Sequence, residues 1–157
     1  PEKSGPRHIA LHPNKPFAYA DNEQGNSITF FRIEKGNLQA VQTLSTVPDD
    51  WDQGGACARL EMSADGTCVY VANRGHNSIA TFRIDQQSGR LTSLGQVPTE
   101  ANPRSFAIHQ NGRFLYAGGQ DTDRLAIFSR ATDGRLKRIG TVQSGKRPWW
   151  LQLVTIP

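Results

Sequence analysis

The sequence predicts an all-β fold, and more narrowly part of a β-propeller, on the strength of three observations. The composition is 36% hydrophobic with 15 Gly and 9 Pro in 157 residues, which favours many short strands joined by turns. Apolar and polar residues alternate along these segments, as in strands that are buried on one face. A block of about 45 residues recurs three times, and this period is typical of four-stranded propeller blades.

Each repeat is built around a tyrosine, and the three copies align on Tyr19, Tyr70 and Tyr116. A turn residue stands five positions before each tyrosine, and in the second copy it opens an Asp-Gly pair, a strong hairpin signal. Each copy closes with Gly-x-Leu, as at 89–91. Strands are therefore expected at 6–12, 17–21, 27–33 and 38–46 in the first unit, 58–63, 67–73, 78–84 and 91–97 in the second, and 104–109, 113–118, 124–129 and 136–143 in the third.

These units form one domain, residues 1–157, made of units 5–47, 54–98 and 101–145 and a closing strand at 147–154. Trp149 and Trp150 are expected to pack that strand. Propellers usually have about 4–8 blades, so three blades and one strand leave the ring open. An open ring exposes apolar sheet faces, which soluble monomers avoid. We therefore expect a missing amino-terminal half, or else self-association, to complete the ring.

Charge and hydropathy narrow the classes of partner. No window approaches about 18 consecutive apolar residues, so a membrane-spanning helix is not expected. The net charge is +4 with dispersed Lys and Arg, and no basic stripe or nucleic-acid-binding module is visible. We therefore expect neither a membrane nor a nucleic acid as partner, whereas a small anion suits this mild basic bias.

The two cysteines are expected to be free thiols. In the hairpin that turns at 65–66, Cys68 faces Ser63 rather than Cys57, so a disulfide between the cysteines is not expected. Buried free thiols are typical of a reducing compartment, and the sequence therefore predicts a cytoplasmic protein.

Strand order within a blade decides on which face of the ring each turn lies. The connection into the innermost strand and the turn between the second and third strands share one face. The other turns share the opposite face, which carries only plain turn residues such as Asp-Gly and Asn-Gly. The first face, named here the channel mouth, carries the charged and aromatic segments at 6–8, 22–23, 49–52, 73–76, 102–104, 120–121 and 147.

Side chains at the channel mouth are the candidates for binding and catalysis, because loops on a rigid scaffold concentrate function. Innermost strands line the central channel, so the residues that open them stand at its mouth. Arg7, Arg104 and Arg147 recur in nearly the same position there, whereas the second unit has Ala58 followed by Arg59. One face is thus rich in functional groups, and the other is not.

Four segments resemble the seven-bladed propeller lactonases, a family that includes bacterial 6-phosphogluconolactonases and fungal carboxymuconate lactonising enzymes. The resemblance implies a seven-bladed ring of which this chain is roughly the carboxy-terminal half, and a small anionic lactone as substrate. It also implies Arg7, Glu23 and Arg74 as active-site residues, with a further histidine outside this chain. The segments are Gly5-Pro-Arg-His-Ile-Ala-Leu-His-Pro13, Tyr19-Ala-Asp-Asn-Glu23, Tyr70-Val-Ala-Asn-Arg-Gly-His-Asn-Ser-Ile79 and Asn102-Pro-Arg-Ser-Phe-Ala-Ile108.

These residue types suit the opening of a lactone, which needs an activated water and a donor for the oxyanion. Glu23 is assigned to the water, as base or positioning group, and Arg7 and Arg74 are assigned to the anion. No metal-ligand spacing is visible, and neither a metal nor a cofactor is expected. The preferred function is hydrolysis of a sugar-acid lactone, with 6-phosphogluconolactone as the leading substrate. The residues expected to contact that substrate are His8, His76 and Arg104.

Two other functions share this fold and remain open. One is a non-catalytic propeller that binds a ligand or a protein, and the other is a muconate cycloisomerase. The family usually has a Glu and a His in the segment where this chain has Arg59 and Glu61. Arg74 could also simply pair with Glu23, and Arg7 could brace one blade against the next.

Overall fold

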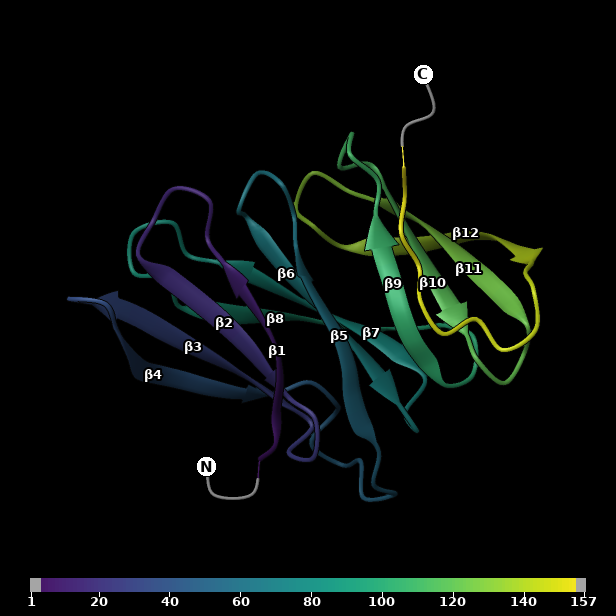
Figure 1. The fold of residues 1–157 in the computed structure, drawn as a ribbon, viewed down its shortest axis with the longest axis horizontal. Coiled ribbons are helices and arrows are strands. Elements are labelled where there is room, and N and C mark those ends of the chain that lie inside the picture. The colour runs from purple at the N-terminus through teal and green to yellow at the C-terminus, as the bar shows by residue number, and fades with distance from the viewer. Residues whose placement is uncertain (1–3, 155–157) are drawn as a thin grey trace.

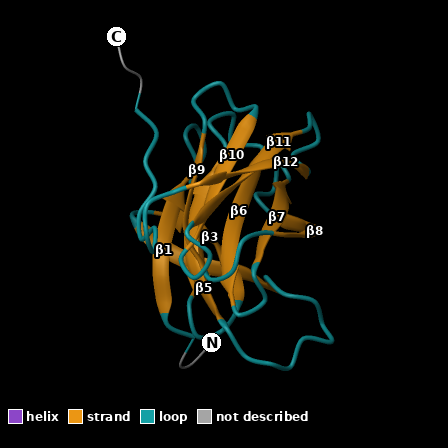
Figure 2. Cartoon of the chain, turned by 90° about the vertical axis from the view of Figure 1, so that its right-hand side faces the viewer, coloured by secondary structure: helices purple, strands orange, loops and turns teal. Residues whose placement is uncertain are grey.

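The computed structural model describes residues 4–154, and the regular elements in that range are all β-strands (Figures 1 and 2). The range holds no helix, and so none that could cross a membrane. The strands form three four-stranded antiparallel sheets, the blades, each in chain order. They are β1 (Pro6–Leu11), β2 (Phe17–Asn22), β3 (Ser27–Glu34) and β4 (Asn37–Ser45) in the first blade, β5 (Ala56–Met62), β6 (Cys68–Arg74), β7 (Ser78–Ile84) and β8 (Leu91–Pro98) in the second, and β9 (Pro103–Ile108), β10 (Phe114–Gly119), β11 (Arg124–Arg130) and β12 (Leu136–Gln143) in the third.

The three predicted blades are confirmed, because each strand begins and ends within two residues of its expected range. Neighbouring blades pack face to face through two apolar cores. Tyr19, Phe30 and Phe82 belong to the core between the first two blades, and Phe106 and Phe128 belong to the next. All five are fully buried, and burial of each such aromatic side chain stabilises the fold by about 1.5–3 kcal/mol. The inner strands β1, β5 and β9 are neighbours, as strands that line a channel must be (Figure 1).

A repeated hydrogen bond ties each blade to the next. The Tyr19 hydroxyl donates to the carbonyl of Gly89, and the Tyr70 hydroxyl donates to that of Gly134, in both cases over 2.8 Å and in buried surroundings. The acceptor glycines belong to the Gly-x-Leu turns of the following blade. Tyr116, the third copy, is only half-buried, and its hydroxyl has no such acceptor among residues 4–154. The side of the third blade that carries Tyr116 is therefore open.

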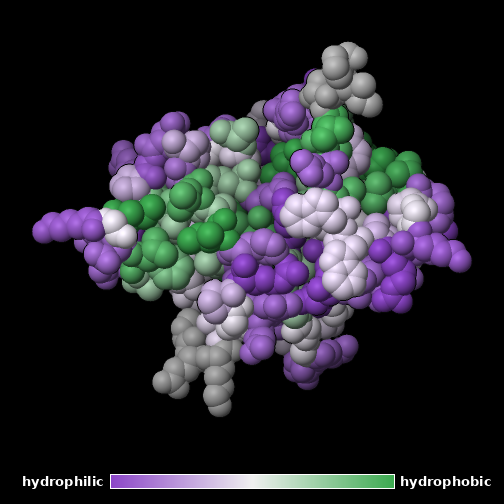
Figure 3. Space-filling model, in the orientation of Figure 1, coloured by the Kyte–Doolittle hydropathy of each residue, from purple (hydrophilic) through white to green (hydrophobic). Residues whose placement is uncertain are grey.

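The first blade has an open face as well. Ile9, Leu11 and Leu38 are 54%, 64% and 49% exposed, and Figure 3 shows an apolar patch over this sheet. On the third blade, Val142 pairs with Leu125 and is 45% exposed. Apolar sheet surface is thus exposed at both ends of the partial ring, as the repeat pattern indicates.

The predicted closing strand at 147–154 is not formed, so that prediction is wrong. Residues 148–154 make no β-ladder and run beside β9, where the Leu151 N–H donates to the Ser105 hydroxyl over 3.0 Å (Figure 1). A strand needs a neighbour for its backbone N–H and C=O groups. In all three blades the neighbour of the innermost strand is the next strand along the chain. Residues 4–154 contain no strand that could play this part for the 147–154 segment.

Both cysteines are free and buried, as expected. Cys68 faces Ser63 across the hairpin, since the Cys68 N–H donates to the Ser63 hydroxyl over 3.0 Å and the Ser63 N–H donates to the Cys68 carbonyl over 2.9 Å. Burial raises the pKa of the Cys57 thiol to about 12. Cys57 is therefore a packing residue rather than a nucleophile at neutral pH.

Candidate active site at the channel mouth

Each innermost strand carries one extra residue close to its start, a β-bulge that bends the strand and re-aims its side chains. The bulged positions include Arg7 in β1, Arg59 in β5 and Arg104 in β9, so each blade presents a guanidinium group by the same means. The ladder registers that define the bulges are Pro6↔Asn22 and then Ile9↔Ala20, Cys57↔Asn73 and then Leu60↔Val71, and Pro103↔Gly119 and then Ser105↔Gly118.

Arg147 does not share the position of the inner-strand arginines, which corrects the predicted equivalence. Gly5, Asn102 and Arg147 have positive φ angles of 62°, 55° and 51°, and each directly precedes a proline. Arg147 is therefore the backbone equivalent of Gly5. Trp149 is the residue that follows the proline, as Arg7 does in the first blade. The prediction failed because it matched residue type rather than backbone conformation.

Glu23, Arg7 and Arg74 are brought together from two blades. Arg74, at the end of β6, donates to the Glu23 carboxylate and, over 3.1 Å, to the Cys57 carbonyl. The Arg7 Nε atom lies 3.5 Å from the second carboxylate oxygen of Glu23. The side chains of Glu23, Arg7 and Arg74 are 35%, 24% and 18% exposed, so they are partly shielded from solvent yet open to the mouth.

Arg104 adds a further positive charge from β9. Burial and the nearby guanidinium groups of Arg74 and Arg7 lower the pKa of Arg104. The Nε atoms of Arg74 and Arg104 are buried and have no hydrogen-bond partner among residues 4–154. Buried guanidinium N–H groups without acceptors suit a ligand that supplies anionic oxygen atoms. The mouth can therefore bind an anion.

His8 lies beside Arg7 and above a buried carboxylate that the sequence pattern did not single out. Its backbone N–H donates to Asp21 Oδ1 over 2.8 Å. Asp21 is fully buried on the face of β2 that also carries Phe17 and Tyr19. The signal that could have revealed it is the alternation itself, because positions 17, 19 and 21 share a face.

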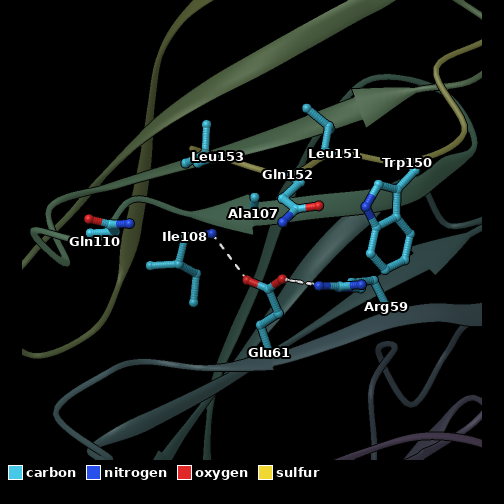
Figure 4. A pocket seen from close by; sticks show the side chains of 9 residues that line it. All are labelled: Arg59, Glu61, Ala107, Ile108, Gln110, Trp150, Leu151, Gln152 and Leu153. Carbon is cyan, nitrogen blue, oxygen red and sulfur yellow. Dashed lines mark hydrogen bonds and ion pairs between the residues drawn. The ribbon is translucent and has the colours of Figure 1, made fainter. Parts of the chain in front are cut away.

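The channel wall next to the mouth is formed by Arg59 and Glu61, which differ from the residues usual in the family, and by two tryptophans that were expected only to pack. Glu61 accepts a hydrogen bond from Arg59 and, over 3.1 Å, one from a backbone N–H of β9 (Figure 4). The Arg59 guanidinium lies over the Trp150 ring at 4.3 Å, and that of Arg104 lies over Trp149 at 3.9 Å. The tryptophans thus stack on inner-strand arginines rather than on a closing strand. Arg59, Glu61 and Trp150 line a cavity of about 270 Å³.

His76 lies in a different environment from the arginines. Its ring packs edge-on against Trp51, with the ring centroids 4.7 Å apart, and its Nδ1 is 2.7 Å from the Ser78 hydroxyl. The positive φ angles of this turn belong to Gly75 and Asn77. The structure therefore places His76 against the 49–52 loop and its own turn, and its contact with a substrate stays a prediction.

Among residues 4–154, no group of three or more His, Cys, Asp or Glu side chains is placed to hold a metal ion. The groups that gather at the mouth are guanidinium, carboxylate and imidazole. They can bind an anion, stabilise an oxyanion, orient a water molecule and exchange a proton.

Comparison with known proteins finds similarity to propeller lactonases. The profile of a family described as "Lactonase, 7-bladed beta-propeller" matches residues 1–153. The chain is 37% identical over 149 residues to the 6-phosphogluconolactonase of Bacillus subtilis, covering 92% of this chain and 43% of that protein. It is 33% identical over 151 residues to the 6-phosphogluconolactonase of Cronobacter sakazakii, covering 94% and 45%.

A solved structure shows the same likeness in three dimensions. The periplasmic gluconolactonase of Pseudomonas aeruginosa matches with a TM-score of 0.93 and 31% identity, covering 100% of this chain and 44% of that one. The chain spans less than half the length of the curated relatives that it matches.

Proposed function

The chain belongs to the seven-bladed β-propeller lactonase family, and we propose that a complete propeller containing these blades hydrolyses a sugar-acid lactone, with 6-phosphogluconolactone as the leading substrate. The observation that supports this most is the gathering of Arg7, Arg74 and Arg104 around the Glu23 carboxylate. Its positive charge suits a substrate that carries a phosphate or carboxylate group. The similar proteins named 6-phosphogluconolactonase support the choice of substrate.

In the proposed reaction, water attacks the carbonyl carbon of the lactone, and the ester bond to the ring oxygen then breaks. Arg7 and Arg74 hold the anionic group of the substrate or the oxyanion that develops on the carbonyl. Glu23, held between these guanidinium groups, orients the water or accepts its proton. Arg104 and His8, next to the cluster, contact the substrate.

We also propose that an amino-terminal half of the same protein completes the ring. Leu38 and the adjacent apolar residues of the first blade are exposed, and Tyr116 on the third blade has no acceptor glycine among residues 4–154. Within the chain, the equivalent faces are covered by the neighbouring blade. The chain covers 43% and 45% of the two curated relatives, a share that leaves room for further blades. Self-association is the alternative, with a second copy on the same faces.

The cytoplasmic location stays a prediction. It rests on the two free, buried cysteines, which are typical of proteins from a reducing compartment. The similar Pseudomonas protein is described as periplasmic. Fractionation of cells that express the complete protein from its own gene decides between the two compartments.

The proposed function is tested by lactone hydrolysis in the complete protein. Glu23→Gln and Arg74→Ala should each lower kcat/KM by about 100-fold or more, because they remove the water-directing carboxylate and an oxyanion donor. The matched controls Glu34→Gln and Arg90→Ala change exposed side chains and should stay within about twofold of the wild type. A wild-type protein without hydrolysis, or variants as active as the controls, would overturn the proposal. Binding of the lactone without turnover would favour the binding-module alternative.

A further inference from the structure

A buried carboxylate lies directly behind the imidazole ring of His8. Asp21 alternates with Phe17 and Tyr19 on the face of β2 that packs against the second blade, and it is 0% exposed. Its Oδ1 accepts the His8 N–H over 2.8 Å, whereas its Oδ2 has no hydrogen-bond partner among residues 4–154. A buried carboxylate oxygen without a donor is costly, so the reason for its presence must be sought in its surroundings.

The His8 ring is held between opposite charges. Its Nδ1 is 3.7 Å from Asp21 Oδ1, and the side chain is 30% exposed at the channel mouth. The Arg7 Nη1 atom lies 3.1 Å from Nδ1 and 3.5 Å from Nε2, so the guanidinium group lies against the ring rather than in line with one nitrogen. The other charged groups close enough to act electrostatically on the ring are Glu23 in the β2–β3 turn and Arg59 in β5.

Glu23 is poorly placed to take a proton on its own. One of its carboxylate oxygens accepts a hydrogen bond from Arg74, and the other lies 3.5 Å from Arg7 Nε. Two guanidinium groups thus compete for the lone pairs that a general base needs. His8 contacts the same Arg7, so its imidazole opens on the same mouth and can accept a proton there at neutral pH.

We propose that His8 accepts the proton of the attacking water, and that Asp21 is a positioning residue that stabilises the imidazolium ion so formed. This inference rests on the proposed lactone hydrolysis. As the water oxygen bonds to the carbonyl carbon, its O–H bond breaks and the proton passes to a ring nitrogen of His8. When the tetrahedral intermediate collapses, the bond between the carbonyl carbon and the lactone ring oxygen breaks, and the His8 imidazolium ion donates the proton to that oxygen. Glu23 orients the water and holds Arg7 and Arg74 in place.

Electrostatics favour this division of roles. Burial first, and then the charges of Arg7 and Arg59, lower the pKa of His8, so most of the rings are neutral and able to accept a proton at neutral pH. The negative charge of Glu23 and a hydrogen bond to a backbone carbonyl of β5 raise the pKa of His8, but by less. An imidazolium ion beside two guanidinium groups needs the negative charge of Asp21 behind it. Burial raises the pKa of Asp21, so the proton affinities of Asp21 and His8 lie closer together than those of a free carboxylate and a free imidazole.

The test is the pH dependence of kcat/KM for 6-phosphogluconolactone in the complete protein. His8→Gln should lower kcat/KM by about 10²–10⁴-fold and abolish the fall in rate on the acid side. Asp21→Asn keeps an oxygen acceptor for the His8 N–H, so the geometry of the β1 bulge is retained. It should lower kcat and move the acid limb to lower pH, because the imidazolium ion loses its counter-charge. The controls His109→Gln and Asp85→Asn, in turns on the opposite face, should leave the profile unchanged.

Two further measurements separate the possible outcomes. Imidazole NMR titration of the complete protein should give a lower pKa for His8 in Asp21→Asn than in the wild type, whether or not substrate is turned over. The acid limb should survive in Glu23→Gln, and its loss there would assign the base to Glu23 instead. An active protein whose profile is unchanged in His8→Gln, or an unshifted His8 titration, overturns this inference alone. A complete protein without lactone hydrolysis overturns the proposed function and this role together.

Discussion

Replacing Tyr19 with phenylalanine removes one hydroxyl group and little else, so the change isolates the hydrogen bond between the first two blades. The hydroxyl donates to the Gly89 carbonyl over 2.8 Å, and both groups are buried. Its loss leaves a buried carbonyl without a donor, which should lower the free energy of unfolding by about 1–3 kcal/mol. Tyr70→Phe should lie at the upper end of that range, because the Tyr70 hydroxyl also accepts a hydrogen bond from Arg130 Nε over 2.8 Å.

Urea unfolding of the 157-residue chain, extrapolated to water, measures these free energies. Tyr116→Phe is the matched control within the chain and should stay within about 0.5 kcal/mol of the wild type. In the complete protein the same control should cost about 1–3 kcal/mol, because the next blade supplies the acceptor glycine. If Tyr19→Phe lowered the free energy of unfolding of the chain no more than Tyr116→Phe does, the hydrogen bond would not stabilise the contact between the blades. A neutral Tyr116→Phe in the complete protein would refute ring closure at that face.

Two further predictions concern the turns on the opposite face. Gly89→Ala should destabilise the chain by about 1–3 kcal/mol more than Gly36→Ala in the same urea assay. Both glycines have positive φ, 77° and 79°, but a Cβ at Gly89 would lie 2.4 Å from Phe30 Cζ, whereas nothing lies within 4 Å at Gly36; equal losses would contradict this steric argument. Although burial alone would raise it, the pKa of Asp65 is lowered by hydrogen bonds from turn hydroxyl groups and by Arg130. Asp65 therefore contributes stability above its unfolded pKa of about 3.9 and loses it as the pH falls. Asp65→Asn should have a lower free energy of unfolding than the wild type at pH 7, and the difference between the two proteins should shrink as the pH falls below about 4. A difference that stays constant down to about pH 2 would contradict this role of Asp65.

The blades could be predicted because the signals that define them are local. Period-two alternation and the turn residues before each tyrosine depend only on neighbours in the chain. The meeting of Glu23 with Arg7 and Arg74 could also be anticipated, because strand order alone places their turns at the same end of the blades. The contacts themselves, one from Arg74 and one at 3.5 Å from Arg7, needed the packed structure.

Other features could not be predicted because they depend on backbone conformation and on the neighbouring blade. Arg147 looked like Arg7 by residue type, but its φ of 51° makes it the equivalent of Gly5. The 147–154 segment has the composition of a strand and still forms none, since its backbone groups have no partner strand within residues 4–154. The stacking of Trp150 on Arg59 joins residues that are 91 positions apart (150 − 59) and carry no shared pattern.

The repeat, the four-stranded blade and the face of the ring that carries the functional groups can all be read from the chain, because they follow from short-range periodicity and from strand order. The groups that surround His8, in contrast, depend on how the blades pack. Asp21 becomes a buried, half-satisfied carboxylate once the second blade packs over β2 and excludes water from it. Burial is a property of the assembled blades and not of one residue's neighbours in sequence. The proton affinities at the mouth, and with them its chemistry, therefore arise only in the folded chain.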